Sequence, residues 1–118
     1  MKTLVIGASP NPMRYAHKAV RRLRSYDIEV VAIGLRETDI EDVRVIKGKP
    51  ALDGIHTVTL YLGPANQKDY LNYIISLKPK RIIFNPGTYN RQLEEMARDA
   101  GIETVEDCTL VMLDTDTY

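Results

Sequence analysis

The stretch VIGASPNPMRY (residues 5–15) decides the fold of this chain. It continues the apolar run of residues 3–6, and a helical pattern begins at Arg14. A strand that enters a Gly/Ser turn and continues as a helix builds a phosphate site. Small residues let the backbone approach an anion, and free N–H groups at the helix start point at it. The stretch therefore predicts a nucleotide-like ligand at Gly7-Ala8-Ser9.

Apolar runs and helical patterns alternate along the rest of the chain. The run at residues 28–33 is continuous and β-branched, as in a parallel sheet that is covered on both faces. Strands are predicted at residues 3–6, 28–33, 43–46, 56–62, 81–84 and 102–105, and helices at 14–25, 66–77 and around 93–100, ending at Gly101. The order predicts an α/β, Rossmann-like fold, with a doubly wound, mainly parallel sheet in three layers. Residues 1–118 are expected to form one domain.

Three segments are harder to assign from the pattern. Residues 39–42 either start a short helix or belong to a loop that leads to the strand at 43–46. Residues 110–113 are expected to form an edge segment of the sheet. The polar residues 114–118 are expected to be loose.

The composition argues against several classes of function. The 16 basic and 16 acidic residues give a formal charge of zero, so no broad positive surface for a nucleic acid or a membrane is expected. No apolar run approaches the roughly 20 residues that span a bilayer, and no signal peptide opens the chain, which favours a cytoplasmic protein. One cysteine and two separated histidines make a metal site unexpected.

Four segments are expected to meet at one edge of the sheet. In doubly wound folds the ligand lies beyond the carboxyl ends of the strands, at the switch in strand order. The segments at these ends are residues 7–9, 34–36, 62–64 and 85–88. Arg14 is expected to reach the anion that Ser9 binds. Because the first turn is neither a full G-x-G-x-x-G fingerprint nor a P-loop, the alternative is a plain tight turn with a surface arginine.

The end of the second predicted strand discriminates between ligands. An NAD site has a carboxylate there, which accepts a hydrogen bond from the ribose 2′-OH. This chain has Arg36 instead, with Glu37 one position later. A guanidinium near the ribose favours an extra ribose phosphate, which is a 2′-phosphate in NADP and a 3′-phosphate in coenzyme A. The alternative is that Arg36 is a solvated loop residue.

Several of these features, in this order, resemble the CoA-binding domain family. They are the first turn followed by Arg14-Tyr15, the basic residue after the second strand, PGT at 86–88 with Asn90, and GIE at 101–103 running into Cys108. The family includes small stand-alone bacterial proteins and the N-terminal domain of succinyl-CoA synthetase alpha chains. The resemblance covers nearly the whole chain and implies a Rossmann-like fold that binds coenzyme A or an acyl-CoA. The expected binding residues are Gly7, Ala8, Ser9, Asn11, Arg14, Tyr15, Gly34, Arg36, Leu62, Pro86, Gly87, Asn90 and Cys108.

No catalytic residue stands out in the sequence. His17 lies in a helix and His56 begins a strand, so each is interpreted as an ordinary histidine. Cys108 has no cationic neighbour in sequence to activate its thiol, and a buried or helix-start role is expected. Glu94 and Glu95 lie early in a helix, where carboxylates favour the macrodipole.

We therefore expect a protein that binds coenzyme A and has no catalytic machinery of its own. Its expected partner is a second copy of the chain or another protein. It is not expected to bind a nucleic acid or a membrane. Two alternatives come from the enzyme class: an NADP-dependent oxidoreductase, and a CoA-thioester enzyme that acts with a partner. A third is a ligand-free Rossmann module used for assembly. Tyr15, Tyr61 and Tyr89 are candidates to stack on an adenine.

Overall fold

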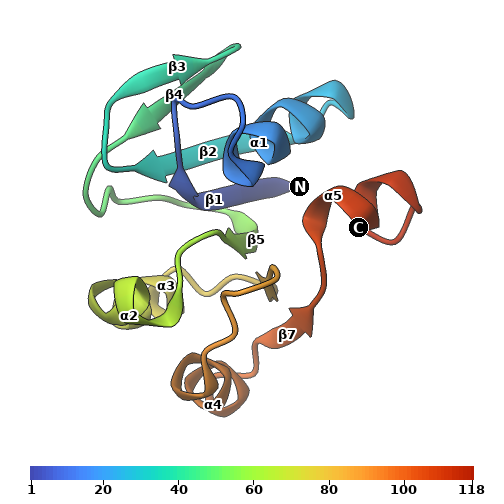
Figure 1. The fold of residues 1–118 in the computed structure, drawn as a ribbon. Coiled ribbons are helices and arrows are strands. Elements are labelled where there is room, and N and C mark those ends of the chain that lie inside the picture. The colour runs from blue at the N-terminus through green and yellow to red at the C-terminus, as the bar shows by residue number, and fades with distance from the viewer.

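Seven strands form one sheet, in the order β3-β4-β2-β1-β5-β6-β7 (Figure 1). All neighbouring strands are parallel except the pair β3 and β4. The computed structural model describes residues 1–118, and its strands are β1 (Lys2–Ala8), β2 (Glu29–Gly34), β3 (Thr38–Ile40), β4 (Val43–Ile46), β5 (Ile55–Leu60), β6 (Arg81–Phe84) and β7 (Glu103–Glu106). The chain winds outward from β1 to β2, then returns to β5 on the other side. The switch in strand order therefore lies between β1 and β5.

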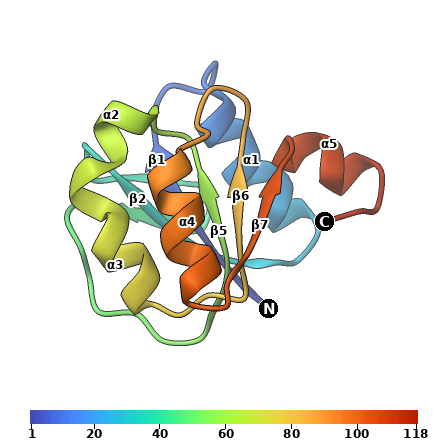
Figure 2. The same cartoon turned by 90° about the horizontal axis from the view of Figure 1, so that it is seen from below.

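Helices cover both faces of the sheet, which confirms the three-layer Rossmann-like architecture (Figure 2). The helices are α1 (Tyr15–Ser25), α2 (Pro64–Gln67), α3 (Leu71–Ser76), α4 (Arg91–Asp99) and α5 (Thr109–Asp114), with a 3-10 turn, η1 (Lys68–Tyr70), between α2 and α3. Residues of α3 and α4 pack on one face of the sheet, whereas residues of α1 and α5 pack on the other. None of these helices combines the length with the apolar composition that spanning a bilayer requires.

The alternation of side chains along β1 divides the core in two. Leu4 and Ile6 belong to the cluster under α3 and α4, and Val5 belongs to the cluster under α1. All three are fully buried, as expected for a central strand whose successive side chains point to opposite faces. Burial of such a side chain stabilises the fold by about 1.5–3 kcal/mol. The strand that carries the first turn is thus fixed from both sides.

The structure decides the uncertain segment at residues 39–42. It forms the tight turn of an antiparallel hairpin, in which Ile40 pairs with Val43 and Thr38 pairs with Val45. The alternative of a short helix is wrong, because Ile40 and Val43 pair as strand residues and are both buried in the cluster under α1, and Glu41 adopts a φ of 53° at the turn. The helix predicted at residues 66–77 begins at Pro64, and the 3-10 turn divides it.

The last ten residues differ from the sequence prediction. Residues 110–113 form helix α5 rather than an edge segment of the sheet, because Thr109, Met112 and Leu113 recur at helical spacing and are buried. Residues 114–118 are not loose. The hydroxyl of Tyr118 is hydrogen-bonded to that of Thr3, and the guanidinium of Arg81 lies 4.5 Å from the centre of its ring. These contacts hold the final segment against the sheet.

Candidate ligand-binding cleft

A cleft of about 770 Å³ opens at the carboxyl ends of β1, β2 and β5. This is the switch in strand order, where doubly wound sheets bind ligands, and the volume is typical of a small-molecule site. Nine of the thirteen residues that the sequence predicted line this cleft: Gly7, Ala8, Ser9, Arg14, Tyr15, Gly34, Arg36, Leu62 and Pro86. Asn11, Gly87, Asn90 and Cys108 do not line it.

Two glycines allow neighbouring backbone segments to pack closely at the base of the cleft. Gly7 has a φ of +100°, and a Cβ there would lie 3.0 Å from the backbone of Tyr61. A Cβ at Gly34 would lie 2.3 Å from the carbonyl oxygen of Ala8. The strand register shifts at this point, so that Ile6 pairs with Ile33 and Ala8 pairs with Gly34. Both positions need glycine for packing reasons, independently of any contact with a ligand.

The first turn is ordered by its own hydrogen bonds. The backbone N–H of Asn11 donates to Ser9 Oγ at 3.1 Å, and the N–H of Met13 donates to Asn11 Oδ1 at 3.0 Å. The N–H of Arg14 donates to the carbonyl of Asn11 at 3.0 Å. Asn11 therefore shapes the turn from inside, which explains why it does not line the cleft. Such local side-chain bonds are typical of Ser and Asn in tight turns.

Helix α1 begins at the cleft without a side-chain cap. Arg14 is its N-cap residue in an extended conformation, and no acidic residue lies in the first turn. The first intrahelical bond runs from the N–H of Lys18 to the carbonyl of Arg14. The amides of residues 15–17, which precede Lys18, consequently have no acceptor within the helix. Because Arg14, Tyr15 and Ala16 line the cleft, these donors and the positive end of the helix dipole make this corner suitable for an anion.

Two arginines line the cleft without a partner. The guanidinium groups of Arg14 and Arg36 make no hydrogen bond or ion pair, whereas seven other cations of the protein are paired with carboxylates. Asp69 is the single acidic residue of the lining, and Glu37 is not part of it. The cleft thus has Arg36 where an NAD site would have its carboxylate.

The opposite wall depends on a residue that the sequence did not suggest. The Gln67 side chain is fully buried, and its Nε2 donates to the carbonyls of Leu62 at 2.8 Å and Thr88 at 2.7 Å. Leu62 and Thr88 both line the cleft. Gln67 therefore joins the loop after β5 to the loop after β6. A polar residue early in a predicted helix gives no sign of such burial, so the sequence offered no signal for it.

The tyrosines divide between different environments. Tyr15 and Tyr61 line the cleft, and Tyr15 is 68% exposed. Burial raises the pKa of the Tyr61 phenol well above its usual range. Tyr89 lies elsewhere, where its hydroxyl donates to Glu94 at 2.8 Å and its ring meets that of Phe84 edge-on. Tyr70, which no motif suggested, also lines the cleft.

A second, smaller hollow of about 360 Å³ holds two of the remaining predicted residues. Gly87 and Cys108 line it, and Pro86 lines both this hollow and the main cleft. Cys108 is the N-cap residue of α5. Asn90 lines neither space, because its side chain caps α4 by accepting a hydrogen bond from the N–H of Leu93.

Neither histidine lines the cleft. His56 lies at the start of β5 beside Thr57, and burial, together with the nearby charge of Arg81, lowers its pKa. His17 lies in the first turn of α1, with Nδ1 2.9 Å from the carbonyl oxygen of Ser9. No three His, Cys, Asp or Glu side chains come together in a way that could hold a metal ion.

Comparison with known proteins agrees with this geometry. A sequence profile described as the CoA binding domain matches residues 1–114. The chain belongs to the CoA binding domain family. A crystal structure of an uncharacterised protein shares 48% sequence identity with this CoA binding domain, with a TM-score of 0.96 over 99% of this chain and 97% of that one. A comparison with curated proteins gives no significant match.

More distant structures share the fold of this CoA binding domain. The cell-free ID.343 protein from Thermus thermophilus is 22% identical, with a TM-score of 0.85 over 99% of this chain and 90% of that chain. The dinucleotide-forming acetyl-coenzyme A synthetase 1 of Ca. Korarchaeum cryptofilum, in complex with phosphate and ADP, is 17% identical with a TM-score of 0.73. That match covers 90% of this chain and 25% of the synthetase chain.

Proposed function

We propose that the cleft binds coenzyme A or an acyl-CoA and that the protein acts by binding rather than by catalysis. The observation that carries this proposal is the meeting of three anion-binding elements in one cleft. They are the Gly7–Ser9 turn with the uncapped start of α1, the unpaired guanidinium of Arg14, and the unpaired guanidinium of Arg36. Membership of the CoA binding domain family supports the same ligand.

The diphosphate of the ligand is assigned to the first turn. Gly7, Ala8 and Ser9 give the backbone close access, the amides at the start of α1 donate to phosphate oxygens, and Arg14 adds a full charge. Asn11 contributes by holding the turn. This part of the site would bind any nucleoside diphosphate.

The adenosine and its 3′-phosphate are assigned to the end of β2. Gly34 leaves room at the strand end, and Arg36 follows two residues later. A guanidinium forms two parallel hydrogen bonds with a phosphate, which makes the extra ribose phosphate a point of recognition. The exposed ring of Tyr15 is available for stacking. This assignment favours coenzyme A over NAD and over dephospho-CoA.

The pantetheine arm is assigned to the remaining wall, formed by Leu62, Pro86 and Thr88. Since Pro86 also lines the smaller hollow, the thiol end of the arm would run past it toward Gly87 and Cys108. Asn90 supports this end indirectly, because it caps the helix that follows the loop.

The chemistry of the lining favours a binding role. Its titratable side chains are two arginines, three tyrosines and Asp69, with no histidine or cysteine among them. These groups suit recognition of phosphate and adenine better than general acid–base chemistry near neutral pH. We infer that any reaction of the bound thioester takes place in a complex with a partner, which is a second copy of this chain or another protein.

Calorimetry with four ligands tests the proposal. Coenzyme A should bind more tightly than dephospho-CoA, and NADP and NAD should bind weakly or not at all. If NADP binds best, the site is a dinucleotide site instead. If no ligand binds, the proposal fails. Native mass spectrometry of the purified protein would identify a co-purified acyl-CoA and the number of chains in the assembly.

A further inference from the structure

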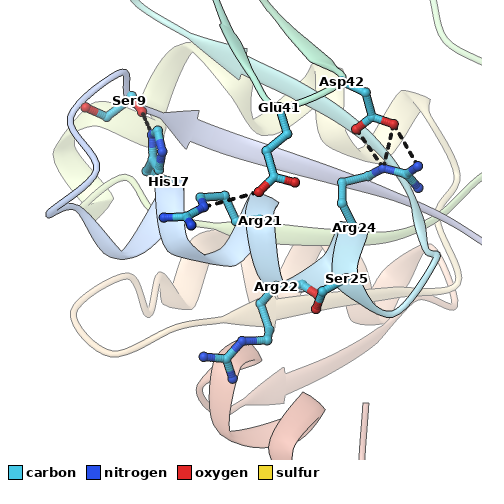
Figure 3. A network of polar contacts seen from close by, with 8 residues as sticks. All are labelled: Ser9, His17, Arg21, Arg22, Arg24, Ser25, Glu41 and Asp42. Carbon is cyan, nitrogen blue, oxygen red and sulfur yellow. Dashed lines mark hydrogen bonds and ion pairs between the residues drawn. The ribbon is translucent and has the colours of Figure 1, made fainter.

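The imidazole of His17, on α1, makes a hydrogen bond to the Gly7–Ser9 turn. His17 lies eight residues after Ser9, and its Nδ1 is 2.9 Å from the Ser9 carbonyl oxygen (Figure 3). A carbonyl oxygen only accepts hydrogen bonds, so Nδ1 must carry the proton and donate. This bond selects the tautomer of the ring, because the partner of one ring nitrogen decides where the proton resides.

The Ser9–Pro10 peptide has no other means of attachment. Proline has no N–H, so the Ser9 carbonyl is the only hydrogen-bonding group of that peptide. The Ser9 hydroxyl already accepts from the N–H of Asn11 inside the turn. The bond from His17 is therefore the one side-chain link between this peptide and the helix.

We propose that His17 is a positioning residue that holds the Gly7–Ser9 turn, called the phosphate turn below, in its binding geometry through the Ser9 carbonyl. The inference rests on the proposed function, because it assigns the turn to the phosphates of the ligand. His17 does not line the cleft, so it acts through Ser9 and not by touching the ligand.

The same helix carries contacts that serve as an internal control. Arg21 Nε lies 3.3 Å from Glu41 Oε1, and Arg24 makes a bidentate contact with Asp42 at 2.8–3.2 Å. Both pairs tie α1 to the turn of the β3–β4 hairpin and do not involve the phosphate turn (Figure 3). Removal of the Arg24–Asp42 pair perturbs the attachment of the same helix but leaves the Ser9 peptide in place.

The test uses three variants of the full chain and two probes, coenzyme A and inorganic pyrophosphate. His17→Leu should weaken binding of both probes by the same factor, about tenfold, since one donor and the order of the turn are lost. His17→Asn should recover affinity to within about twofold, because its amide can donate from nearly the position of Nδ1. Asp42→Asn should bind both probes like the wild type, whatever its effect on the unfolding temperature. Nitrogen-15 NMR of the wild type should show a protonated Nδ1 on His17 at neutral pH.

Each result is decisive for one idea or the other. The positioning role is overturned if His17→Leu binds like the wild type, if Asn fails to recover affinity, or if the ring is protonated only at Nε2. A wild type that binds pyrophosphate but not coenzyme A overturns the proposed function, and the pyrophosphate titrations then still test His17. A wild type that binds neither probe overturns both.

Discussion

The side-chain amide nitrogen of Gln67 lies 2.7 Å from the carbonyl oxygen of Thr88, 21 residues later in the chain. The same nitrogen donates its other proton to Leu62, so one buried amide bridges two loops that wall the cleft. Both carbonyls would lose their donor without it, and an unsatisfied buried acceptor is costly. The two loops on this side of the cleft are therefore joined by a residue that does not line it.

Gln67→Leu should destabilise the protein by about 2 kcal/mol, because the buried carbonyl of Thr88 and the part-buried carbonyl of Leu62 lose their hydrogen bonds. Urea unfolding measures the change. Lys68→Ala, at the exposed neighbouring position, is the control and should stay within about 0.5 kcal/mol. Equal stability of Gln67→Leu and the wild type would contradict a bridging role for the amide.

Gly34→Ala should destabilise the protein by about 3 kcal/mol, because its Cβ would meet the Ala8 carbonyl at 2.3 Å and the backbone must move. The affinity for coenzyme A should fall as well, since the moved segment belongs to the cleft. Gly63→Ala is the matched control: it has a φ of −64°, and a Cβ there meets nothing within 4 Å. Thermal unfolding should leave Gly63→Ala close to the wild type. A tolerated Gly34→Ala would show that the two strand ends separate easily.

Arg36→Met should weaken coenzyme A by roughly 10- to 100-fold, the value of about 1.5–3 kcal/mol for hydrogen bonds to a charged group. Its effect on dephospho-CoA should be small, because that ligand lacks the 3′-phosphate. Arg14→Met should weaken both ligands alike, since both carry the diphosphate. Calorimetry of the two variants with the two ligands gives four dissociation constants to compare with those of the wild type. Equal losses for Arg36→Met with both ligands would remove the role assigned to Arg36.

Tyr118→Phe should destabilise the protein by about 1 kcal/mol through loss of the hydrogen bond to Thr3. Tyr118→Ala should cost about 2–4 kcal/mol, because the ring packed against Arg81 is lost as well. Tyr26→Phe is the control, since Tyr26 is 50% exposed. Urea unfolding should show the largest loss of stability for Tyr118→Ala, a smaller one for Tyr118→Phe and the smallest for Tyr26→Phe. If all three match the wild type, the final segment contributes nothing to stability.

The pKa of His56 is lowered by burial and by Arg81, so the fold favours its neutral form. As the pH falls below about 6.5, His56 takes up a proton in the unfolded chain before it does so in the fold. The unfolded chain then binds more protons, and stability declines with falling pH. His56→Gln should lose this part of the decline. Unfolding temperatures of both proteins between pH 5 and pH 8 provide the check, and parallel curves would refute the assignment.

The parts of the molecule that the sequence predicted are those set by local pattern and by topology. The first strand, turn and helix follow one another in residues 2–25, and the strand-end rule then brings Arg14, Gly34 and Arg36 to one cleft without knowledge of any distance. The position of Tyr118 could not be predicted this way, because its partner Thr3 lies 115 residues earlier.

The polar residue that the sequence analysis missed and the two predicted ones that do not line the cleft share a different cause. Asn11 and Asn90 were candidate ligand contacts, yet their side chains accept from backbone amides of the turn and of α4. No sequence motif singled out Gln67, which is fully buried. A short amide side chain looks the same in sequence whether it caps a helix, bridges two loops or meets a ligand, so only its neighbours in space decide its role.

The uncapped start of α1 sets stability against affinity at one position. An Asp, Asn or Ser at residue 14 would cap the helix and stabilise the protein by about 1 kcal/mol. That same side chain would accept hydrogen bonds from the amides that bind a phosphate, and would therefore compete with the ligand for them. The arginine at this N-cap gives up that gain in stability and leaves the amides for another molecule. Selection for a more stable variant would therefore be expected to favour substitutions here that weaken ligand binding.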